Sequence, residues 1–389
     1  MTSAPLQQGW RSCTTTPRRA EVRLTVVAEQ LVRPIPGGLG TYTRQLLDGL
    51  FELQSTAGGP PIDLEIRLSR GLKASEVGEP PEPWRAAIAP WPTPRTLTQQ
   101  LVDLGWLRCG GGASVLHATT LGGPRPGRPR PGRVSAMVAD LSFLTSPGTT
   151  TARGRRWHLA ALERARQDCD LLFTLSEQSR QALVRSGIAE DQIAVVTMAP
   201  PAAVPGGDAA AESLLDTLAI TGDFLLSVST AEPRKNLARL LTARERSALA
   251  RELPLVVIGP TGWGSSGLEL PSPGVHLAGR VPTATLQALY RRARLLCYIP
   301  LEEGFGLPPL EALAQGTPVL ASTAVPSVND GVATRVDPFD LEAIAAGLDH
   351  ALSATAAVEQ QVAVATSTVG ARTPADLAAA HLEHWMRHG

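Results

Sequence analysis

The feature that most constrains this fold is an alternation of short apolar runs with amphipathic helical segments, which occurs in both halves of the chain. In the first half, Val22–Ala28 is an apolar run rich in β-branched residues, typical of a buried strand, and Tyr42–Leu53 carries leucines at helical spacing. The pattern begins again at Phe224–Ser229, which precedes a helical segment at Leu237–Glu245. Strands that alternate with helices form parallel sheets covered by helices on both faces. The sequence therefore predicts an α/β protein with two parallel-sheet lobes, whose ligands bind beyond the carboxyl ends of the strands.

The same patterns predict the remaining elements of the two lobes. Further strands are expected at Ile62–Leu68, Val115–Leu116, Val134–Val138, Leu171–Leu175, Ile193–Thr197, Leu255–Ile258, Val275–Leu277, Leu295–Tyr298 and Pro318–Ala321. Further helices are expected at Arg155–Cys169, Glu177–Ser186, Thr283–Ala293, Pro308–Ala314, Asp340–Leu352 and Thr373–Arg387. Pro124–Arg133 is expected to be a basic loop, because its prolines fix φ and remove backbone donors.

Length and local composition divide the chain into two domains. At roughly 100–200 residues per domain, a chain of 389 residues suggests two. Ala199–Ala211 is rich in proline, glycine and alanine, as interdomain linkers are. We expect residues 1–20 to be a disordered tail, residues 21–204 to form the first lobe, residues 205–372 the second lobe, and residues 373–389 to carry a C-terminal helix.

The composition argues against several classes of protein. The formal net charge is zero, so nothing draws the whole chain to nucleic acid. No apolar run approaches the ~20 residues needed to cross a bilayer, and residues 1–20 lack the apolar core of a secretory signal. The cysteines have no paired spacing of a disulfide framework or a zinc site: Cys13, Cys109, Cys169 and Cys297. We therefore expect a cytoplasmic protein with no metal site and no nucleic-acid partner.

The strongest candidate binding segment is Tyr298–Ser322, in which Glu303 and Glu311 are eight residues apart. Glu303 ends a loop after a predicted strand, and Glu311 is expected in the first turn of the next helix. Between them, Gly304 and Gly306 let a ligand approach the backbone, and free N–H groups at the helix start bind hydroxyl or phosphate oxygens. Two carboxylates accept hydrogen bonds from paired hydroxyls, so the segment predicts a site for a sugar or a ribose. The structural alternative is that Glu311 only complements the helix dipole and Glu303 faces water.

Arg234 and Lys235 form a second candidate site at the end of the first strand of the second lobe. They precede a predicted helix with Asn236 near its cap, where cations are unfavourable on structural grounds alone. A bound diphosphate would explain cations at that position, because the helix amides and the ammonium group converge on the same charge. Lys73 and Lys235 are the only lysines among 36 basic residues, which also sets this position apart. A solvated basic turn is the alternative.

Weaker candidates lie in the first lobe. Pro36–Gly40 is a glycine-rich turn after the first strand, and a tight structural turn is its alternative explanation. His117 ends a predicted strand, and a buried structural histidine fits its position equally well. The arginines of the Pro124–Arg133 loop are candidates for contact with anionic lipid headgroups, although a solvated loop is the simpler interpretation.

Several of these segments together resemble the GT-B glycosyltransferases of family 4, especially the mannosyltransferase-like branch. They run in the family's order from about Val22 to Asp340. The matching stretches are PIPGGLGTYTRQLLDGL, ADLSFLTSP, LLFTLSEQSRQALV, LLSVSTAEPRKNLARLL, VHLAGRVPTATLQALYRRA and EEGFGLPPLEALAQGTPVLAS. The EPRKN segment together with the two glutamates separated by seven residues is the specific part of the resemblance.

The resemblance implies two Rossmann-like lobes with a cleft between them, retention of the anomeric configuration, and no cofactor or metal beyond a nucleotide-sugar donor. It implies that Glu303 contacts donor-sugar hydroxyls and that Glu311 holds the nucleotide ribose. Arg234 and Lys235 would stabilise the leaving diphosphate. The residues that would approach the donor through their backbone are Gly304, Phe305, Gly306, Leu307, Gly37 and Gly38. The C-terminal helix would cross back onto the first lobe.

The acceptor side departs from the family pattern. Many relatives have a His-Asp pair where this chain has Ala139-Asp140, which leaves Asp140 and His117 as acceptor-side candidates. The resemblance implies transfer of a hexose, with mannose as the expected sugar, to a saccharide or lipid-linked acceptor. The basic loop adds peripheral contact with the inner membrane face as a further expectation. Ala139 also supports a rival, a non-catalytic nucleotide-sugar-binding or scaffold protein of the same fold. A sugar-nucleotide epimerase or a phosphorylase is a third alternative.

Overall fold

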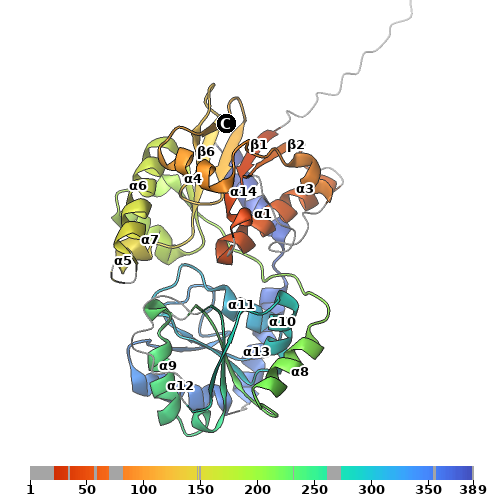
Figure 1. Cartoon of the computed structure of the whole chain (residues 1–389), viewed down its shortest axis with the longest axis vertical. Helices are drawn as coiled ribbons and strands as arrows, with labels where there is room; N and C mark the ends of the chain where they lie inside the picture. The colour runs from red at the N-terminus through yellow and green to blue at the C-terminus, as the bar shows by residue number, and fades with distance from the viewer. Residues whose placement is uncertain are drawn as a thin grey trace, which may run out of the picture.

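The protein consists of two α/β lobes stacked one above the other (Figure 1). The structure is a computed structural model that describes residues 22–33, 36–56, 59–69, 82–146, 148, 150–230, 232–260, 273–353 and 356–387. Each lobe is built on one six-stranded sheet in which every pairing is parallel. The predicted α/β fold with two parallel-sheet lobes is therefore confirmed. The expected tail, residues 1–20, lies outside the described residues.

The first lobe carries the sheet order β2-β1-β4-β6-β7-β8. Its strands are β1 (Val22–Val27), β2 (Ile62–Arg67), β4 (Val115–Ala118), β6 (Arg133–Val138), β7 (Leu171–Thr174) and β8 (Ile193–Val195). Its helices are α1 (Gly37–Ser55), α3 (Glu82–Ala87), α4 (Arg95–Asp103), α5 (Ser142–Thr145), α6 (Ala152–Asp168) and α7 (Glu177–Arg185), with short 3₁₀ turns η1 (Glu29–Val32) and η3 (Glu190–Gln192). Two very short strands, β3 (Arg108–Cys109) and β5 (Arg125–Pro126), pair apart from the main sheet.

The second lobe repeats this plan with the sheet order β11-β10-β9-β12-β13-β14. Its strands are β9 (Leu225–Val228), β10 (Leu255–Ile258), β11 (Val275–Gly279), β12 (Leu295–Tyr298), β13 (Val319–Ser322) and β14 (Thr334–Val336). Its helices are α8 (Asp208–Thr217), α9 (Leu237–Arg246), α10 (Thr283–Arg292), α11 (Leu307–Ala314), α12 (Leu341–Leu352) and α13 (Ala356–Gly370), with 3₁₀ turns η4 (Pro233–Lys235) and η5 (Ala250–Glu252). The last helix, α14 (Pro374–Met386), leaves this lobe.

Each sheet changes direction at one point in its strand order. In the first sheet the chain runs from β1 outward to β2 and then returns to continue from β4 in the other direction. In the second sheet the same reversal separates β9 from β12. Loops that follow the strands diverge at such a switch point and leave a crevice at the carboxyl ends, where ligands of open parallel sheets bind.

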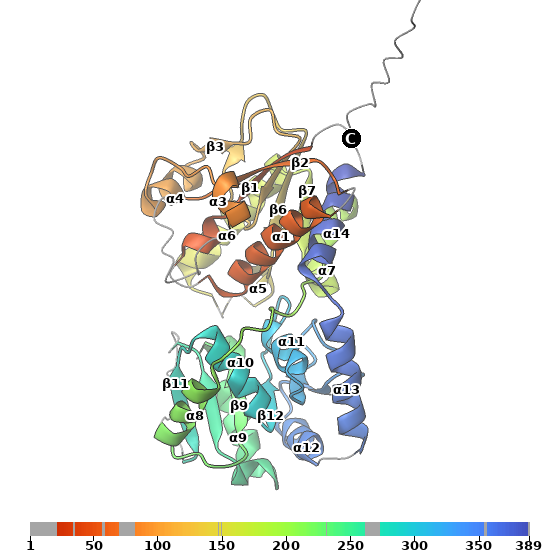
Figure 2. The ribbon, with the colours of Figure 1, turned by 90° about the vertical axis from the view of Figure 1, so that its right-hand side faces the viewer.

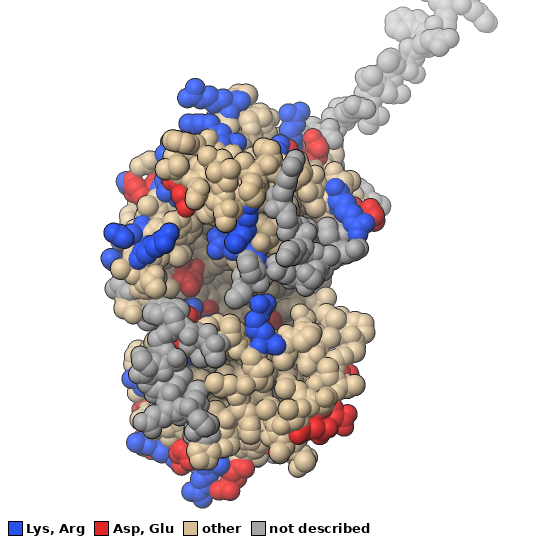
Figure 3. All heavy atoms as spheres, viewed as in Figure 1, with Lys and Arg blue, Asp and Glu red and all other residues tan. Residues whose placement is uncertain are grey.

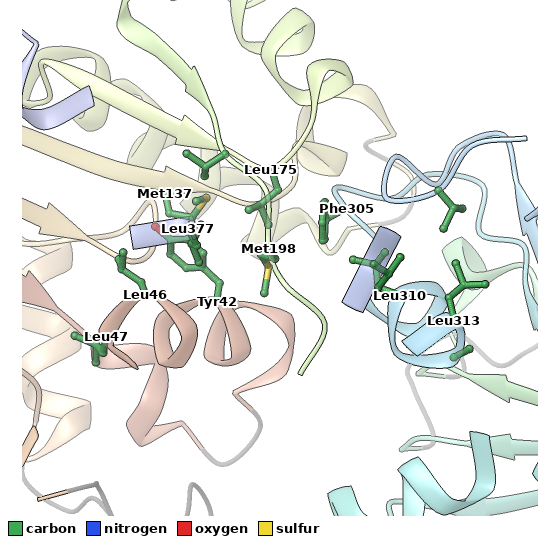
Figure 4. Close-up of a cluster of buried hydrophobic side chains, with 14 of the residues drawn as sticks. Tyr42, Leu46, Leu47, Met137, Leu175, Met198, Phe305, Leu310, Leu313 and Leu377 are labelled. Carbon is green, nitrogen blue, oxygen red and sulfur yellow. The ribbon is translucent and has the colours of Figure 1, made fainter. Parts of the chain in front are cut away.

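The apolar core extends through both lobes. All residues of β4, β7, β10, β12 and β13 are buried, as expected for parallel strands that helices cover on both faces. Figure 4 shows Met198 between first-lobe side chains such as Tyr42 and the second-lobe side chain Phe305. The interlobe crossing is therefore part of one buried cluster, which also holds Leu310 and Leu313.

Helix α14 returns to the first lobe and packs along α1 (Figure 2). The two helices approach closely at Gly49 of α1, where a Cβ atom would lie 2.0 Å from the carbonyl oxygen of Pro374. Thr373 and Asp376 form a capping box at the start of α14, so the helix begins at this contact. A glycine is required at position 49 because a backbone oxygen occupies the space of a side chain.

Replacing Gly49 with alanine should therefore destabilise the protein by about 1–3 kcal/mol, the usual cost of overpacking a close contact. The matched control is Gly222→Ala, since a Cβ atom at Gly222 meets nothing within 4 Å. Denaturant unfolding of both variants measures the effect. Equal stability of the two variants would contradict the close approach of α1 and α14.

Buried polar side chains form a second link between α14 and the first lobe. His381 of α14 bonds the carbonyl oxygen of Leu377 through Nδ1 at 2.8 Å, so Nδ1 carries the proton. Its Nε2 atom, 2.8 Å from the Tyr42 hydroxyl, therefore accepts a hydrogen bond from Tyr42. The Tyr42 oxygen lies 2.9 Å from Nε2 of His117, which then acts as the donor. The network thus assigns a tautomer to each ring.

This buried chain of hydrogen bonds, called the relay below, also ends on α14 at its other side. The indole nitrogen of Trp385 donates to the Ser135 hydroxyl at 2.9 Å. The Ser135 hydroxyl lies 3.0 Å from Nδ1 of His117 and donates to it, because that ring donates through Nε2. Every donor in this buried relay thus meets an acceptor, provided that His117 and His381 are both neutral.

Acid should weaken this relay. Burial lowers the pKa of His381 to about 3 and holds the pKa of His117 well below its usual 6.5. In the unfolded chain both rings bind a proton below about pH 6.5, and in the folded chain they do not. The unfolded state therefore binds more protons, and stability falls as the pH drops from about 6.5 toward 3, by up to about 1.4 kcal/mol per pH unit for each ring.

The measurement is the free energy of unfolding between pH 7 and pH 5. His381→Gln should show a shallower fall with pH than the parent protein, while the exposed His350→Gln serves as the control. An unchanged slope in His381→Gln would rule out a neutral, buried histidine at this position.

Several details differ from the sequence predictions. The linker predicted at Ala199–Ala211 ends sooner, because α8 begins at Asp208. Helix α13 was not predicted, and Arg125–Pro126 pairs as a strand inside the predicted basic loop. The glycine-rich turn is wrong in its boundary, since Gly37 is already the first residue of α1. Among the described residues, no helix is long and apolar enough to cross a bilayer.

Candidate active site

The loops after β9 and β12 meet at the switch point of the second sheet. The backbone N–H of Leu301 donates to the carbonyl oxygen of Arg234 at 2.9 Å, which joins the two loops directly. Asn236 adopts a left-handed conformation (φ 60°) and is 4% exposed. Its amide does not cap α9 but donates to the carbonyl oxygens of Ile299 and Pro338, at 3.2 and 2.8 Å. These bonds fix both loops, which carry the predicted cations and the first predicted glutamate.

Lys235, Glu303 and Tyr298 form a closed triangle of hydrogen bonds. The Lys235 ammonium lies 2.6 Å from Oε2 of Glu303 and 2.9 Å from the Tyr298 hydroxyl. The Tyr298 hydroxyl donates to the same glutamate oxygen at 2.6 Å. The Lys235 and Glu303 side chains are only 12% and 13% exposed, so the pair is largely shielded from water. Tyr298 was not among the predicted site residues, although its place at the end of β12, directly before the glutamate segment, marks it as a site residue.

Arg234 joins the second lobe to the first. Its guanidinium lies 3.1 Å from Glu232, 3.9 Å from Glu303 and 3.7 Å from Asp140, which follows β6 of the first lobe. It also donates to the carbonyl oxygen of Glu302 at 3.2 Å. The two cations of the site thus face three carboxylates, one of them across the cleft.

The charges of these groups are set by burial and by one another. Burial alone would raise the pKa of Glu303, but Lys235 and Arg234 outweigh it and bring the pKa below its usual value. Burial, followed by the charge of Glu303, raises the pKa of Tyr298 well above 10. Burial opposes the charge on Arg234, yet the carboxylates around it raise its pKa. Glu303 is therefore a carboxylate at neutral pH, and Tyr298 is a protonated donor.

The segment Gly304–Leu307 connects the triangle to α11 and touches the first lobe. A Cβ atom at Gly304 would lie 2.0 Å from the carbonyl oxygen of Ala139, so the lobes are in contact here. Gly306 has φ +96° and faces Val325, where a Cβ atom would be 2.6 Å from a methyl carbon. The Phe305 side chain is 6% exposed and lies in the core (Figure 4), so this residue can offer a ligand only its backbone.

The start of α11 offers fewer amides than the sequence analysis assumed. Leu307 is the first residue of the helix, and Pro308 and Pro309 follow it. Neither proline has an N–H group, so two of the amides that usually bind anions at a helix start are missing. The cations of the β9 loop must therefore carry most of the attraction for an anion.

Glu311 lies in the second turn of α11, not in the first as predicted. Its Oε2 atom accepts a hydrogen bond from the Tyr290 hydroxyl at 2.8 Å. Burial raises the pKa of Glu311, and the bond from Tyr290 only partly offsets this. The Glu311 charge also raises the pKa of Tyr298, after the larger effects of burial and of Glu303, which indicates that the two glutamates share one region. Glu303 has two cationic neighbours, whereas Glu311 has a phenol.

The structure places the glycines and Asp140 of the first lobe at the interlobe contact, and it buries His117 away from that contact. Gly37 has φ +59° at the start of α1, and a Cβ atom at Gly38 would lie 3.4 Å from Leu307 of the second lobe. Asp140 also lies at the interlobe contact, where Oδ1 accepts from the backbone and hydroxyl of Ser142. His117 is fully buried within the first lobe, in the relay to α14. The geometry therefore favours the structural alternative for His117.

Two regions beside this contact are hollowed. Figure 3 shows the surface sunk between the two lobes, with acidic and basic atoms inside the hollow. On the first-lobe side, a cavity of about 220 Å³ lies at the carboxyl ends of β1, β4 and β6. Asp140 lines this cavity and also faces Arg234, so the cavity is next to the cation cluster.

Comparison with known proteins identifies the class. Residues 218–365 match the family Glycosyl transferases group 1, a range that contains the β9 loop, the glutamate segment and Glu311. Solved structures with the same architecture include Anabaena Alr3699/HepE in complex with UDP and glucose, with a TM-score of 0.63, 15% identity, and coverage of 93% of this chain and 98% of that one. WaaG, a glycosyltransferase involved in lipopolysaccharide biosynthesis, has a TM-score of 0.63 at 16% identity and covers 95% of this chain and 100% of its own. The protein therefore has the GT-B fold, and residues 218–365 of its second lobe are similar to glycosyl transferases group 1.

Several curated proteins that are similar in sequence to this chain are mannosyltransferases. The chain is 30% identical over 226 residues to O-antigen chain mannosyltransferase B of Escherichia coli, which is 55% of this chain and 59% of the relative. It is 30% identical over 216 residues to the serotype-specific mannosyltransferase WbdA of Escherichia coli, covering 50% of this chain and 25% of that protein. The chain thus spans just over half of the first relative and a quarter of the second. It has the GT-B fold and is similar to these mannosyltransferases over about half of its own length.

Proposed function

We propose that this protein transfers a hexose, with mannose as the expected sugar, from a nucleoside diphosphate sugar to a saccharide or lipid-linked acceptor. The observation that carries the proposal is the cluster of Lys235, Arg234 and Glu303 at the switch point of the second sheet, facing Asp140 of the first lobe. A crevice at that place with two shielded cations suits a diphosphate. The names of the curated relatives support a glycosyl transfer and the choice of mannose.

The chemistry follows from the charge that develops in the reaction. The bond between the anomeric carbon and the diphosphate oxygen breaks, and a bond forms between that carbon and the acceptor hydroxyl oxygen. The hydroxyl proton leaves with the diphosphate. Lys235 and Arg234 stabilise the negative charge that builds on the leaving group, in a site largely closed to water. Because these side chains supply the positive charge, the proposal includes no metal ion.

The remaining roles extend the proposal to the rest of the site. Glu303 binds donor-sugar hydroxyls, Glu311 holds the ribose, and the backbone of Gly37, Gly38 and Gly304–Leu307 lines the donor. The acceptor occupies the first-lobe cavity beside Asp140, with attack from the face that the leaving group departs from and hence retention of the anomeric configuration. Contact between Gly304 and Ala139 supports this arrangement, since it brings the donor loop to the edge of that cavity.

A cytoplasmic protein with contact at the inner membrane face is a separate part of the proposal. The basic loop gives it less support than its sequence suggested, because Arg125 pairs with Asp168 and Arg130 with Asp170. Sedimentation with vesicles of neutral or anionic lipid tests this part. Recovery of the protein in the supernatant in both cases would remove the membrane from the proposal.

The direct test of function is product analysis with a donor whose sugar is labelled. A transferase leaves label on a second molecule, and the anomeric configuration of that product, read by NMR, tests retention. The rival, a non-catalytic binding protein that Ala139 would suit, binds nucleotide sugar and yields no labelled product with any acceptor. An epimerase or a phosphorylase would leave the label on a nucleotide sugar or on a sugar phosphate.

A further inference from the structure

The first-lobe cavity is built as a binding site. Its volume is about 220 Å³, and it lies where the first sheet reverses its strand order between β1 and β4. Gln30 and Arg33 follow β1, Thr120 follows β4 and Asp140 follows β6, so four side chains from three strand ends converge on it. It therefore occupies the ligand position of the first sheet, as the cation cluster does in the second.

Gln30 presents an unsatisfied acceptor at this cavity. Its side chain is 6% exposed, and its amide nitrogen donates to the carbonyl oxygen of Pro36 at 2.5 Å. Within the described ranges, its Oε1 atom has no hydrogen-bond partner. A buried acceptor without a partner costs about 1–3 kcal/mol, and a donor group on a ligand would recover it. Gln30 thus adds a polar side chain with an unsatisfied acceptor to the cavity wall.

Arg33 adds an unpaired cation to the same cavity. In the part of the chain that the structure describes, no carboxylate oxygen lies within ion-pair distance of its guanidinium. Burial, and then the charge of Arg95, lower the pKa of Arg33, while the charges of Glu29 and Asp103 only partly offset them. A partly buried guanidinium of this kind binds phosphate or carboxylate with two parallel hydrogen bonds.

The cavity is lined by a cation, Arg33, and by a carboxylate, Asp140, that lies at the interlobe contact. Asp140 lines the cavity and faces Arg234 of the donor lobe at 3.7 Å. The lining also includes the stacked rings of Phe143 and His158, whose centroids are 5.0 Å apart. A ligand that fills the cavity therefore meets an unpaired cation, two aromatic rings and a carboxylate that faces the donor lobe.

We propose that the acceptor carries a phosphoryl group that binds Arg33, while a hydroxyl of the same molecule reaches Asp140 at the cleft. This inference rests on the proposed function, since the cavity serves an acceptor only if the donor binds beside it. A phosphoryl group of up to two charges gains more from a shielded cation than a neutral sugar does. The phosphoryl group belongs either to a free sugar phosphate or to a lipid phosphate, which share this chemistry.

The test is titration calorimetry in the presence of saturating UDP or GDP, which occupies Lys235 and Arg234 and keeps the probes from them. The probes are mannose 6-phosphate, mannose, and octyl phosphate. Mannose 6-phosphate should bind at least about tenfold more tightly than mannose, as expected for a charge-assisted pair. Comparable affinity of octyl phosphate would identify a lipid phosphate as the source, and preference for mannose 6-phosphate would identify a sugar phosphate.

Variants assign the effect to Arg33. Arg33→Gln should weaken binding of the phosphorylated probe at least about tenfold, and Arg33→Lys should restore part of it. Arg185→Gln, at the exposed end of α7, is the matched control and should leave binding unchanged. If both phosphorylated probes bind no better than mannose, or if Arg33→Gln binds like the parent protein, the inference is overturned while nucleotide binding still supports the proposed function. Loss of UDP and GDP binding in the parent protein would instead overturn the proposed function itself.

Discussion

Replacing Lys235 with methionine should lower kcat by about 100- to 1,000-fold, the usual effect of removing one group that stabilises a developing anion. In the proposed reaction Lys235 is the cation nearest to Glu303, which is proposed to bind the donor sugar. Its ammonium group lies 2.6 Å from the Glu303 carboxylate, whereas the Arg234 guanidinium lies 3.9 Å away. Methionine keeps the length and apolar stem of the side chain and removes only the charge. Steady-state kinetics with a labelled donor measures the change.

The same substitution also affects stability, and a second variant separates the two effects. Without Lys235, the shielded Glu303 keeps the hydrogen bond from Tyr298 but only one cation, the more distant Arg234 at 3.9 Å, which should cost about 3 kcal/mol. Adding Glu303→Gln removes the uncompensated charge, so the double variant should regain most of its stability but none of its activity. Arg246→Met, on the exposed face of α9, is the control. A Lys235→Met protein with near-normal kcat would remove Lys235 from the mechanism.

Replacing Glu311 with glutamine should make the protein more stable and a weaker binder of nucleotide. Burial raises the pKa of Glu311, because it disfavours the charged form of the carboxyl group in the folded protein. Glutamine keeps an acceptor for the Tyr290 hydroxyl, now 2.8 Å from the carboxylate, and removes the charge. Stability should rise by roughly 0.5–1 kcal/mol, while nucleoside diphosphate affinity falls about 10- to 100-fold through loss of charge-assisted bonds to the ribose.

The pH dependence gives this prediction a sign. A carboxyl group with a raised folded-state pKa binds its proton more tightly in the folded protein, so it contributes stability at low pH that is lost as the pH rises through the folded pKa. The advantage of Glu311→Gln should therefore shrink on acidification. Glu212→Gln, on the exposed side of α8, is the control. Unchanged nucleotide affinity in Glu311→Gln, with stability raised as expected, would mean that Glu311 is a buried acid without a role in binding.

The strands were predictable because parallel strands leave a plain pattern. Leu295–Tyr298 forms β12 with the predicted bounds, since a short apolar run that follows Arg294 and ends before Pro300 is typical of a buried strand. Helix α8 was hidden because the glycines and prolines before Asp208 dominate the composition of that segment. In the relay from Trp385 to His117, the bond between Trp385 and Ser135 joins residues 250 positions apart, and no local pattern carries such a contact.

The candidate site was predictable in its charges and not in its pairings. The EPRKN and glutamate segments are the specific parts of the sequence, and the structure brings Lys235 and Glu303 into contact. The role of Tyr298 in that contact depends on where β12 ends beside β9, which only the sheet register decides. The pairing of Asp140 with Arg234 depends on how the lobes meet, which local patterns do not encode. His117 illustrates the reverse case, since a strand-end position suggested a cleft residue and the packing of α14 buries it.

The central claim is that the crevice between β9 and β12 binds the donor through one cation pair and two carboxylates. A crystal structure with bound UDP or GDP tests it most directly. We predict that the diphosphate oxygens lie within about 3.2 Å of the Lys235 ammonium and the Arg234 guanidinium, and that the ribose hydroxyls donate hydrogen bonds to the Glu311 carboxylate. A nucleotide that binds elsewhere, or one that contacts neither Lys235 nor Glu311, would contradict it.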